Sequence, residues 1–295
     1  MDYMDLTSDQ IEKILGRKEH DLTSLFEQAA QYYRNKTIVI TGSMGSLGTA
    51  LNSFFRDYNV ECSIVNVDIA YDRKQSPDGI CMDIINPFSM RALINNTDPD
   101  FIFHFAADKH APAGERTPDS TININIEGTK NILSAIKNSK SKLILSSTCK
   151  SCNPETVYGA SKVIAERLCL NNGHNVARYY NVIESSENVF EIWNSIEDSS
   201  QHEVMLCTRF FITIKEALGL TLFAGMQESG RFTINPGKDR HILDIHFNLY
   251  GDHGQIISPR RGDRLQELRS STSENIISIK DTFFEQIINE HDAIL

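Results

Sequence analysis

Two residues near the middle of the chain have types and a spacing suited to proton transfer. Tyr158 and Lys162 are four residues apart, so they share one face if this segment is helical. A lysine ammonium beside a phenol lowers the phenol pKa from about 10, which lets the tyrosinate accept a proton from a sugar hydroxyl while hydride leaves for a nicotinamide. The same spacing also arises by chance as a surface pair, so the interpretation depends on the other motifs of the chain.

A glycine-rich turn follows the first apolar, β-branched run at residues 37–41. Gly42, Gly45 and Gly48 form a G-x-x-G-x-x-G pattern at this point. Glycines placed there can turn the chain, let backbone N–H groups approach a pyrophosphate and pack the next helix tightly on a sheet. Three glycines alone could equally form a structural turn, but their position between a strand and a helix favours a dinucleotide site.

An acidic residue stands where the ribose of such a dinucleotide would be recognised. Asp68 ends the second apolar run, about 20 residues after Gly48, the interval at which a carboxylate reaches the ribose hydroxyls. Because a carboxylate repels a 2′-phosphate, we expect NAD. Arg73 and Lys74 follow Asp68 and could bind that phosphate, so NADP stays as an alternative.

Alternating strands and helices would bring these residues to one edge of a sheet. Short apolar runs at 37–41, 62–68, 101–105 and 142–146 alternate with helix-like segments such as 47–55 and 126–137. This alternation predicts an α/β fold, a Rossmann-type doubly wound parallel sheet with a small C-terminal substrate lobe. We expect an N-terminal helical appendage over residues 1–34 and an NAD-binding core with the Tyr/Lys pair over 35–182. Residues 183–295 would form the mainly substrate-binding lobe, with some chain returning to the core.

Composition and charge restrict the classes of function. Hydrophobic residues make up 40% of the chain, which is enough for a sizeable core, and the net charge of −10 gives no global positive field for nucleic acid. The first five residues carry acids where a signal peptide needs bases, and no run of about 18 apolar residues could span a membrane. We therefore expect a cytoplasmic protein. Its 6 cysteines are scattered along a long chain, which favours reduced thiols over a disulfide framework.

Taken together, the motifs resemble those of the extended short-chain dehydrogenases/reductases. Within them, the sequence is most similar to the polysaccharide-biosynthesis branch that contains the inverting UDP-N-acetylglucosamine 4,6-dehydratases. The similarity covers about residues 11–270. Besides the motifs above, it rests on the segments 105–112, 125–131, 147–150, 178–182, 208–213 and 260–265, which read FAADKHAP, NIEGTKN, STCK, RYYNV, TRFFIT and RRGDRL.

The resemblance implies a set of site residues at matching positions. Those that would hold NAD, or alternatively NADP, are Gly42, Met44, Gly45, Ser46, Leu47, Gly48, Asp68, Asp83, Ile84, Ala106, Ala107, Asn125, Tyr158 and Lys162. The implied catalytic residues are Thr148, Cys149, Lys150, Tyr158 and Lys162. A nucleotide-sugar would be held by Lys109, His110, Asn181, Arg209 and Arg260, although His110 could equally be a loop residue. No metal site is expected, and the family implies a homo-oligomer.

The implied reaction is the loss of water from a UDP-hexose similar to UDP-N-acetylglucosamine. Tyr158 and Lys162 would oxidise the sugar at C4, and the new ketone would acidify the C5 proton. Lys150 would remove that proton, water would leave from C6, and hydride would return to carbon. Since hydride leaves and returns on the same cofactor, no net reduced cofactor should accumulate.

Two departures from the family pattern leave the reaction open. The family's dehydratases have Asp, the acid for the departing C6 hydroxyl, where this chain has Cys149, and a thiol holds the leaving oxygen less well. A 5,6-alkene-forming dehydratase and a nucleotide-sugar epimerase or reductase are therefore alternatives, with a non-catalytic scaffold less favoured. After Asn181, the usual glycine-rich stretch is replaced by one with Glu184 and Glu187, which suits a diphosphate poorly. We interpret the C-x-x-C spacing of Cys149 and Cys152 as coincidental, and not as a zinc-binding or redox motif.

Overall fold

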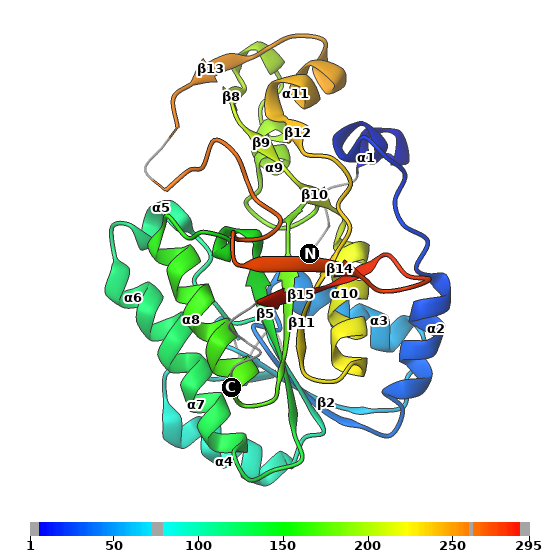
Figure 1. Cartoon of the computed structure of the whole chain (residues 1–295), viewed down its shortest axis with the longest axis vertical. Helices are drawn as coiled ribbons and strands as arrows, with labels where there is room; N and C mark the ends of the chain where they lie inside the picture. Colours follow the sequence, from blue (N-terminus) through cyan, green and yellow to red (C-terminus); the bar gives the residue numbers. More distant parts are fainter. Residues whose placement is uncertain (1–5, 72–78, 260–261, 290–295) are drawn as a thin grey trace.

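A nine-stranded sheet forms the centre of the structure, a computed structural model that describes residues 6–71, 79–259 and 262–289 (Figure 1). The strand order is β14-β15-β11-β6-β5-β4-β1-β2-β3. The strands from β3 to β11 pair in parallel, whereas β15 is antiparallel to both β11 and β14. The strand bounds are β1 (Thr37–Thr41), β2 (Ser63–Asp68), β3 (Gly79–Cys81), β4 (Phe101–His104), β5 (Lys142–Thr148), β6 (Asn175–Tyr179), β11 (Gly230–Ile234), β14 (Glu274–Ser278) and β15 (Phe284–Asn289). The expected α/β fold of Rossmann type is confirmed.

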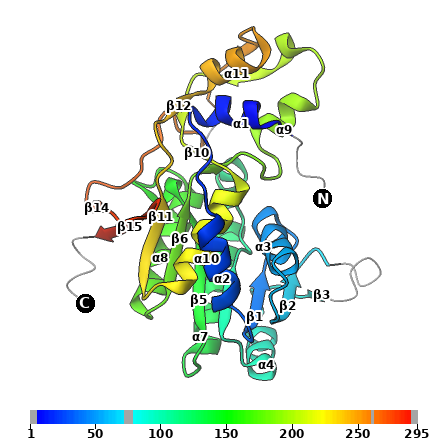
Figure 2. The ribbon, with the colours of Figure 1, turned by 90° about the vertical axis from the view of Figure 1, so that its right-hand side faces the viewer.

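Helices cover both faces of this sheet (Figures 1 and 2). One face carries α2 (Thr23–Tyr32), α3 (Ser46–Asp57) and α10 (Ile214–Met226), and the other carries α4 (Pro87–Thr97), α7 (Gly128–Ile136) and α8 (Val157–Asn171). Successive side chains of a strand point to opposite faces, so Ile38 and Ile40 enter the first hydrophobic cluster and Val39 the second. Burial on both faces explains why β1 reads as a continuous apolar run.

Short helical segments connect β4 to α7 and β5 to α8. They are α5 (Ala111–Gly114), α6 (Pro118–Ile122), a π-helical turn at Asn123–Glu127 and a 3₁₀ turn at Cys149–Ser151. Within the π-helical turn, Asn125 is buried and donates hydrogen bonds to the Asp108 carbonyl and to Ser161 Oγ, both at 2.9 Å. These contacts hold the loop after β4 against α8.

A smaller lobe lies at one end of the molecule, at the top of Figure 1. It contains α1 (Ser8–Leu15), α9 (Val189–Asn194), α11 (Ile242–Tyr250) and a 3₁₀ turn at Ser199–Gln201. Its paired short strands are β7 (Asn181–Val182) with β10 (Phe211–Ile212), β8 (Glu203–Met205) with β13 (Gln255–Ile257), and β9 (Thr208–Arg209) with β12 (Arg240–His241). Its hydrophobic cluster joins Ile14 of α1 to Trp193 and Ile245, whereas Phe26 of α2 belongs to the cluster on the sheet. The two N-terminal helices therefore pack on different parts of the protein.

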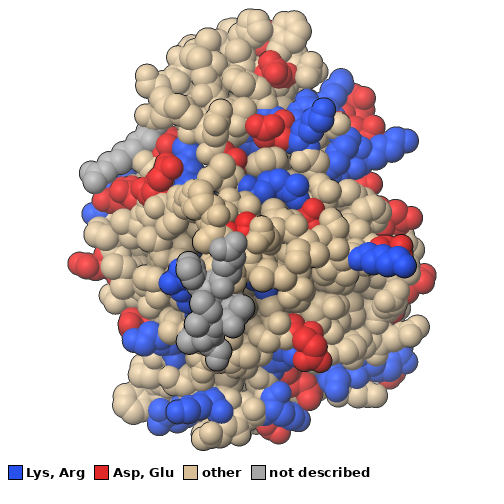
Figure 3. Space-filling view, in the orientation of Figure 1, with Lys and Arg blue, Asp and Glu red and all other residues tan. Residues whose placement is uncertain are grey.

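Charged side chains of both signs are interspersed on the face drawn in Figure 3. Every helix in the described ranges is too short or too polar to cross a lipid bilayer. Those ranges also contain no group of three or more His, Cys, Asp or Glu side chains arranged to hold a metal ion. All six cysteines are free thiols.

Candidate active site

A cleft of about 730 Å³ opens where β1, β2, β4, β5 and β6 end. Most residues predicted from the sequence line it, namely Gly42, Met44, Gly45, Ser46, Leu47, Asp68, Asp83, Ile84, Ala106, Ala107, Lys109, His110, Thr148, Lys150, Tyr158, Lys162 and Asn181. Gly48, Asn125, Cys149 and Arg209 do not line it, and Arg260 lies outside the described residues, as do Arg73 and Lys74. Residues far apart in the sequence therefore meet in one cleft.

The glycine turn after β1 has no room for side chains at two of its glycines. Gly42 has φ +70°, and a Cβ there would lie 2.5 Å from the Ala106 backbone nitrogen. A Cβ on Gly48 would lie 2.5 Å from the Gly42 carbonyl oxygen. The turn leads into α3 at Gly45, where no side chain of the described residues caps the helix. Uncapped N–H groups at a helix start attract anions, so this cradle fits a dinucleotide pyrophosphate.

Asp68 connects the glycine turn to the end of β2. Its carboxylate accepts hydrogen bonds from the backbone N–H groups of Met44 and Ala70, both at 2.9 Å. A carboxylate offers about four acceptor positions, so two of them stay free for other donors. Because Asp68 also lines the cleft, its free lone pairs fit the hydroxyls of a ribose.

The predicted catalytic pair lies in the first turns of α8. Thr156 caps this helix by accepting from Gly159 N at 3.0 Å, and Glu115 accepts from Val157 N at 2.8 Å. Lys162 does not donate to Tyr158 but to the Ser146 carbonyl, at 3.0 Å, and burial lowers the pKa of Lys162 to about 8.

Lys150 is a cation that acts on Tyr158 in this structure. Burial raises the pKa of Tyr158, and the Lys150 ammonium together with a hydrogen bond from Thr148 partly opposes that rise. Lys150, Thr148 and Tyr158 all line the cleft. The helical spacing predicts Lys162 as the cation beside the phenol, and the structure adds Lys150, from the turn after β5, as a further charge that favours the phenolate.

Lys150, Asn181 and Glu267 form a closed set of polar contacts at the cleft. Lys150 Nζ donates to Glu267 Oε1 at 3.1 Å and to Asn181 Oδ1 at 3.2 Å, and Asn181 Nδ2 donates to Glu267 Oε2 at 2.6 Å. Arg209 Nε lies 3.5 Å from the same carboxylate. Although burial lowers the pKa of Lys150, the Glu267 charge raises it well above its usual value, so Lys150 is an ammonium. The sequence motifs did not single out Glu267, and its only signal is its place two residues after the 260–265 segment.

Cys149 lies behind the wall of the cleft. Its side chain is fully buried beside Glu267, and burial raises the pKa of the thiol far above its usual value. Burial also raises the pKa of Cys152 to about 11, while Arg178 Nη1 lies 3.3 Å from its sulfur. Both members of the C-x-x-C motif are therefore neutral, buried thiols.

The loop after Asn181 crosses from the glycine turn to the loop after β4. Ser186 N donates to Ser46 Oγ at 3.1 Å, and the Ser186 carbonyl accepts from Lys109 Nζ at 2.9 Å. Glu187 Oε2 lies 2.9 Å from His110 Nε2. Glu184 accepts from Ile214 N at 2.8 Å, at the start of α10. Each of the two carboxylates in this loop thus has its own partner.

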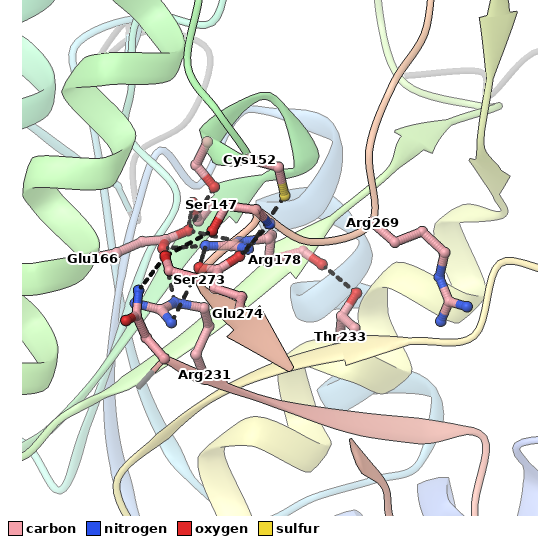
Figure 4. A network of polar contacts seen from close by, with 12 residues as sticks. Ser147, Cys152, Glu166, Arg178, Arg231, Thr233, Arg269, Ser273 and Glu274 are labelled. Carbon is pink, nitrogen blue, oxygen red and sulfur yellow. Dashed lines mark hydrogen bonds and ion pairs between the residues drawn. The ribbon is translucent and has the colours of Figure 1, made fainter. Parts of the chain in front are cut away.

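A buried network of charges lies beside the turn after β5 (Figure 4). Glu166 of α8 forms ion pairs with Arg178 at 2.6 Å and with Arg231 at 2.8 Å, and Arg178 also reaches Glu274 of β14 at 2.8 Å. Glu166 further accepts from the hydroxyls of two residues that flank Thr148 and Lys150, namely Ser147 and Ser151. The two acids and two bases balance, so this network fixes the turn after β5 against the C-terminal strands.

Comparison with known proteins identifies the family of this chain. Residues 38–285 match the family model described as "Polysaccharide biosynthesis protein". The capsular polysaccharide biosynthesis protein CapD of Staphylococcus aureus is 30% identical over 268 residues, which cover 81% of this chain and 44% of the relative. The inverting UDP-N-acetylglucosamine 4,6-dehydratase of Campylobacter jejuni is 29% identical over 272 residues, with 82% and 80% covered.

A solved structure shows the same fold. It is the UDP-glucose 4-epimerase of Thermus thermophilus in complex with NAD, which superposes with a TM-score of 0.68 at 17% identity and covers 79% of this chain and 90% of its own. This chain spans less than half the length of CapD. The family model covers most of the chain, which confirms the expected relationship. The chain belongs to the polysaccharide biosynthesis protein family, within the extended short-chain dehydrogenases/reductases.

Proposed function

We propose that this protein is a nucleotide-sugar dehydratase that uses NAD to remove water from a UDP-hexose. The observation that carries the proposal is the meeting of Tyr158, Thr148 and Lys150 in the same cleft as the glycine turn and Asp68. The resemblance to the inverting dehydratase of Campylobacter jejuni, over four-fifths of both chains, supports the same reaction.

The cofactor would be held by the glycine turn and Asp68. The turn carries no side chains at Gly42, Gly45 and Gly48 and leads into a helix start without a side-chain cap from the described residues, which suits a pyrophosphate, and the Asp68 carboxylate disfavours the 2′-phosphate of NADP. When bound, the nicotinamide supplies a reversible acceptor for hydride. Ile84 and Ala107 also line the cleft, where their apolar side chains would exclude water from the dinucleotide.

Tyr158 would act as the base at the sugar C4 hydroxyl. Its phenol must lose a proton first, and burial opposes that loss. The Lys150 charge and the Thr148 hydrogen bond favour the phenolate, so the three residues act as one unit. Lys162 would complete the cofactor site from the next helical turn.

Elimination needs a base for the C5 proton and an acid for the C6 hydroxyl. We assign both steps to Lys150, which lines the cleft, because the Cys149 thiol lies behind its wall. The neutral amine would take the C5 proton, and the resulting ammonium would return it to the departing hydroxyl to form water. In the free protein Lys150 is already an ammonium, so this sequence requires that Lys150 first gives its proton to solvent water.

The nucleotide diphosphate would lie near Asn181 and Arg209. Asn181 lines the cleft. Arg209 does not line it, and its Nε lies 3.5 Å from the Glu267 carboxylate. Guanidinium groups bind diphosphates through paired N–H donors, so a rotation of Arg209 away from Glu267 would provide one such contact.

The pairing of Lys150 with Glu267 favours a second candidate, a nucleotide-sugar 4-epimerase. Epimerisation needs only the C4 oxidation that Tyr158 serves, and no base at C5. A protein whose Lys150 stays an ammonium would stop at this stage.

The test is incubation with a panel of UDP- and other nucleotide-sugars in heavy water without added reductant, followed by mass spectrometry and NMR. Loss of one water with solvent deuterium in the product supports the dehydratase. An isomer of unchanged mass that carries no deuterium on carbon supports the epimerase, and no change with any sugar contradicts both.

A further inference from the structure

Glu267 is a buried carboxylate at the active site without being part of the cleft surface. Its side chain is 1% exposed, and it lies in the segment between β13 and β14. It accepts hydrogen bonds from Lys150 and Asn181, which do line the cleft. A buried carboxylate is costly unless it is paired, so its position is held by these partners.

Asn181 connects the buried Glu267 to the surface of the cleft. Its amide nitrogen donates to Glu267 and its amide oxygen accepts from Lys150, so the amide has one defined orientation. The ammonium of Lys150 is thereby held by two acceptors, one of them charged. A change at Glu267 would therefore move or release both residues.

Four titratable or charged groups act on Lys150 in the described part of the chain. They are Glu267 and Arg209 from the C-terminal half, Tyr158 from α8, and Cys149 from the same turn as Lys150. Burial keeps the phenol and the thiol protonated, and Arg209 is a cation. Glu267 is therefore the anion of this set at neutral pH.

We propose that Glu267 is a positioning residue that fixes Lys150 and Asn181 at the cleft and sets whether Lys150 is an ammonium or an amine. The proposal deepens the proposed function and rests on it where it concerns the C5 proton. In the dehydratase sequence, Lys150 gives its proton up before it takes one from C5, and the carboxylate 3.1 Å away governs that loss.

The test compares Glu267→Gln with the unaltered protein by competitive labelling with acetic anhydride. Only the neutral amine reacts, so the labelling of Lys150 against pH, measured by peptide mass spectrometry, gives its pKa. An opposite charge within about 4–6 Å shifts a pKa by about 1–3 units, so the midpoint is expected to fall by at least about one pH unit. An unchanged midpoint overturns the proposal.

Glu155→Gln is the matched control. Glu155 is 72% exposed and lies 3.7 Å from Arg264, so it removes a negative charge from the same region without touching Lys150. We expect its labelling midpoint for Lys150 to equal that of the unaltered protein. Should Glu267→Gln not fold, Glu267→Asp keeps the buried charge but withdraws it from Lys150, and a smaller fall of the midpoint is expected.

Turnover separates this proposal from the proposed function. If the protein removes water from a nucleotide-sugar, the pH profile of Glu267→Gln is expected to shift to lower pH, whereas a merely structural role would reduce turnover equally at every pH. If no sugar loses water but the labelling midpoint still falls, the proposed function is wrong and the control of Lys150 by Glu267 stands.

Discussion

Lys150 and Glu267 are 117 residues apart in the sequence, and their side chains form an ion pair of 3.1 Å at the edge of the cleft. The pair joins the turn after β5 to the segment before β14. The ammonium lines the cleft, whereas the carboxylate is buried behind it. The chemistry available to Lys150 therefore depends on a residue that does not itself line the site.

Tyr158→Phe is expected to reduce turnover by about 10²- to 10⁴-fold, because the phenol is the proposed base at C4. The ring is kept, so the affinity for the nucleotide-sugar should stay within about twofold. Product formation by mass spectrometry and binding by calorimetry measure the two effects. Tyr58→Phe, at an exposed tyrosine outside the cleft, is the control, and full activity of Tyr158→Phe would remove the redox assignment.

Cys149→Asp is expected to destabilise the protein at pH 7 by about 3–5 kcal/mol, since it buries a second carboxylate beside Glu267. Burial and the Glu267 charge raise the pKa of the new carboxyl above its unfolded value of about 3.9. The loss of stability is therefore smallest below about pH 4 and grows as pH rises towards the pKa in the folded protein. Thermal unfolding from pH 4 to 8 measures it.

The double variant Cys149→Asp, Glu267→Gln should regain most of that stability, because one of the two charges is gone. Its products also test the role of position 149. If the Cys149 thiol has redirected the reaction, an Asp at position 149 should shift the product towards the 4-keto-6-deoxy sugar. The same product from the variant and from the unaltered protein would show that Cys149 does not determine the product.

Gly48→Ala is expected to weaken dinucleotide binding at least about tenfold, because the new Cβ would displace the backbone of the glycine turn. Gly173→Ala provides the control. It has φ +75° but open space around the added Cβ, so it should cost about 1 kcal/mol of stability without affecting binding. Calorimetric titration with NAD measures the affinity, and equal binding by both variants would contradict the assigned cradle.

Arg178→Met is expected to cost about 3–5 kcal/mol of unfolding free energy, because Glu166 and Glu274 then share Arg231 alone. Burial raises the pKa of Glu166, but the charges of Arg178 and Arg231 have the larger effect and lower this pKa to about 2. In the unaltered protein this stabilisation is present above about pH 4.5 and is lost as pH falls towards 2. Urea unfolding at pH 7 and pH 4 checks both points, and Arg56→Met, at an exposed pair with Asp57, should cost less.

Glu184→Gln is expected to stabilise the protein above neutral pH. Burial raises the pKa of Glu184 from 4.5 to about 7, so ionisation destabilises the folded state as pH rises from about 4.5 to 7. The unfolding free energies of variant and unaltered protein, measured in urea, should agree at pH 4.5 and differ at pH 8 by an amount on the order of 1–3 kcal/mol. Glu197→Gln, at an exposed site, should show no such dependence.

The sequence by itself determined the parts of the site that depend on local pattern. Gly42 comes directly after β1, Gly48 lies at the start of the next helix and Asp68 ends β2. The alternation of apolar runs with helical segments therefore predicted that they meet at one edge of a parallel sheet. Tyr158 could be identified because Lys162, the other residue of its motif, lies about one helical turn away. Such signals are short in sequence, so periodicity and spacing carry them.

Only the tertiary structure decided which charges meet. Glu267 reaches Lys150 from beyond β13, and Glu274 reaches Arg178 because the C-terminal strands return to the sheet. The same packing buries Cys149 behind the cleft and brings Lys150 to Tyr158. Pairings across about a hundred residues leave no period in the sequence, because they depend on how the chain closes on itself and on which charges burial forces to pair.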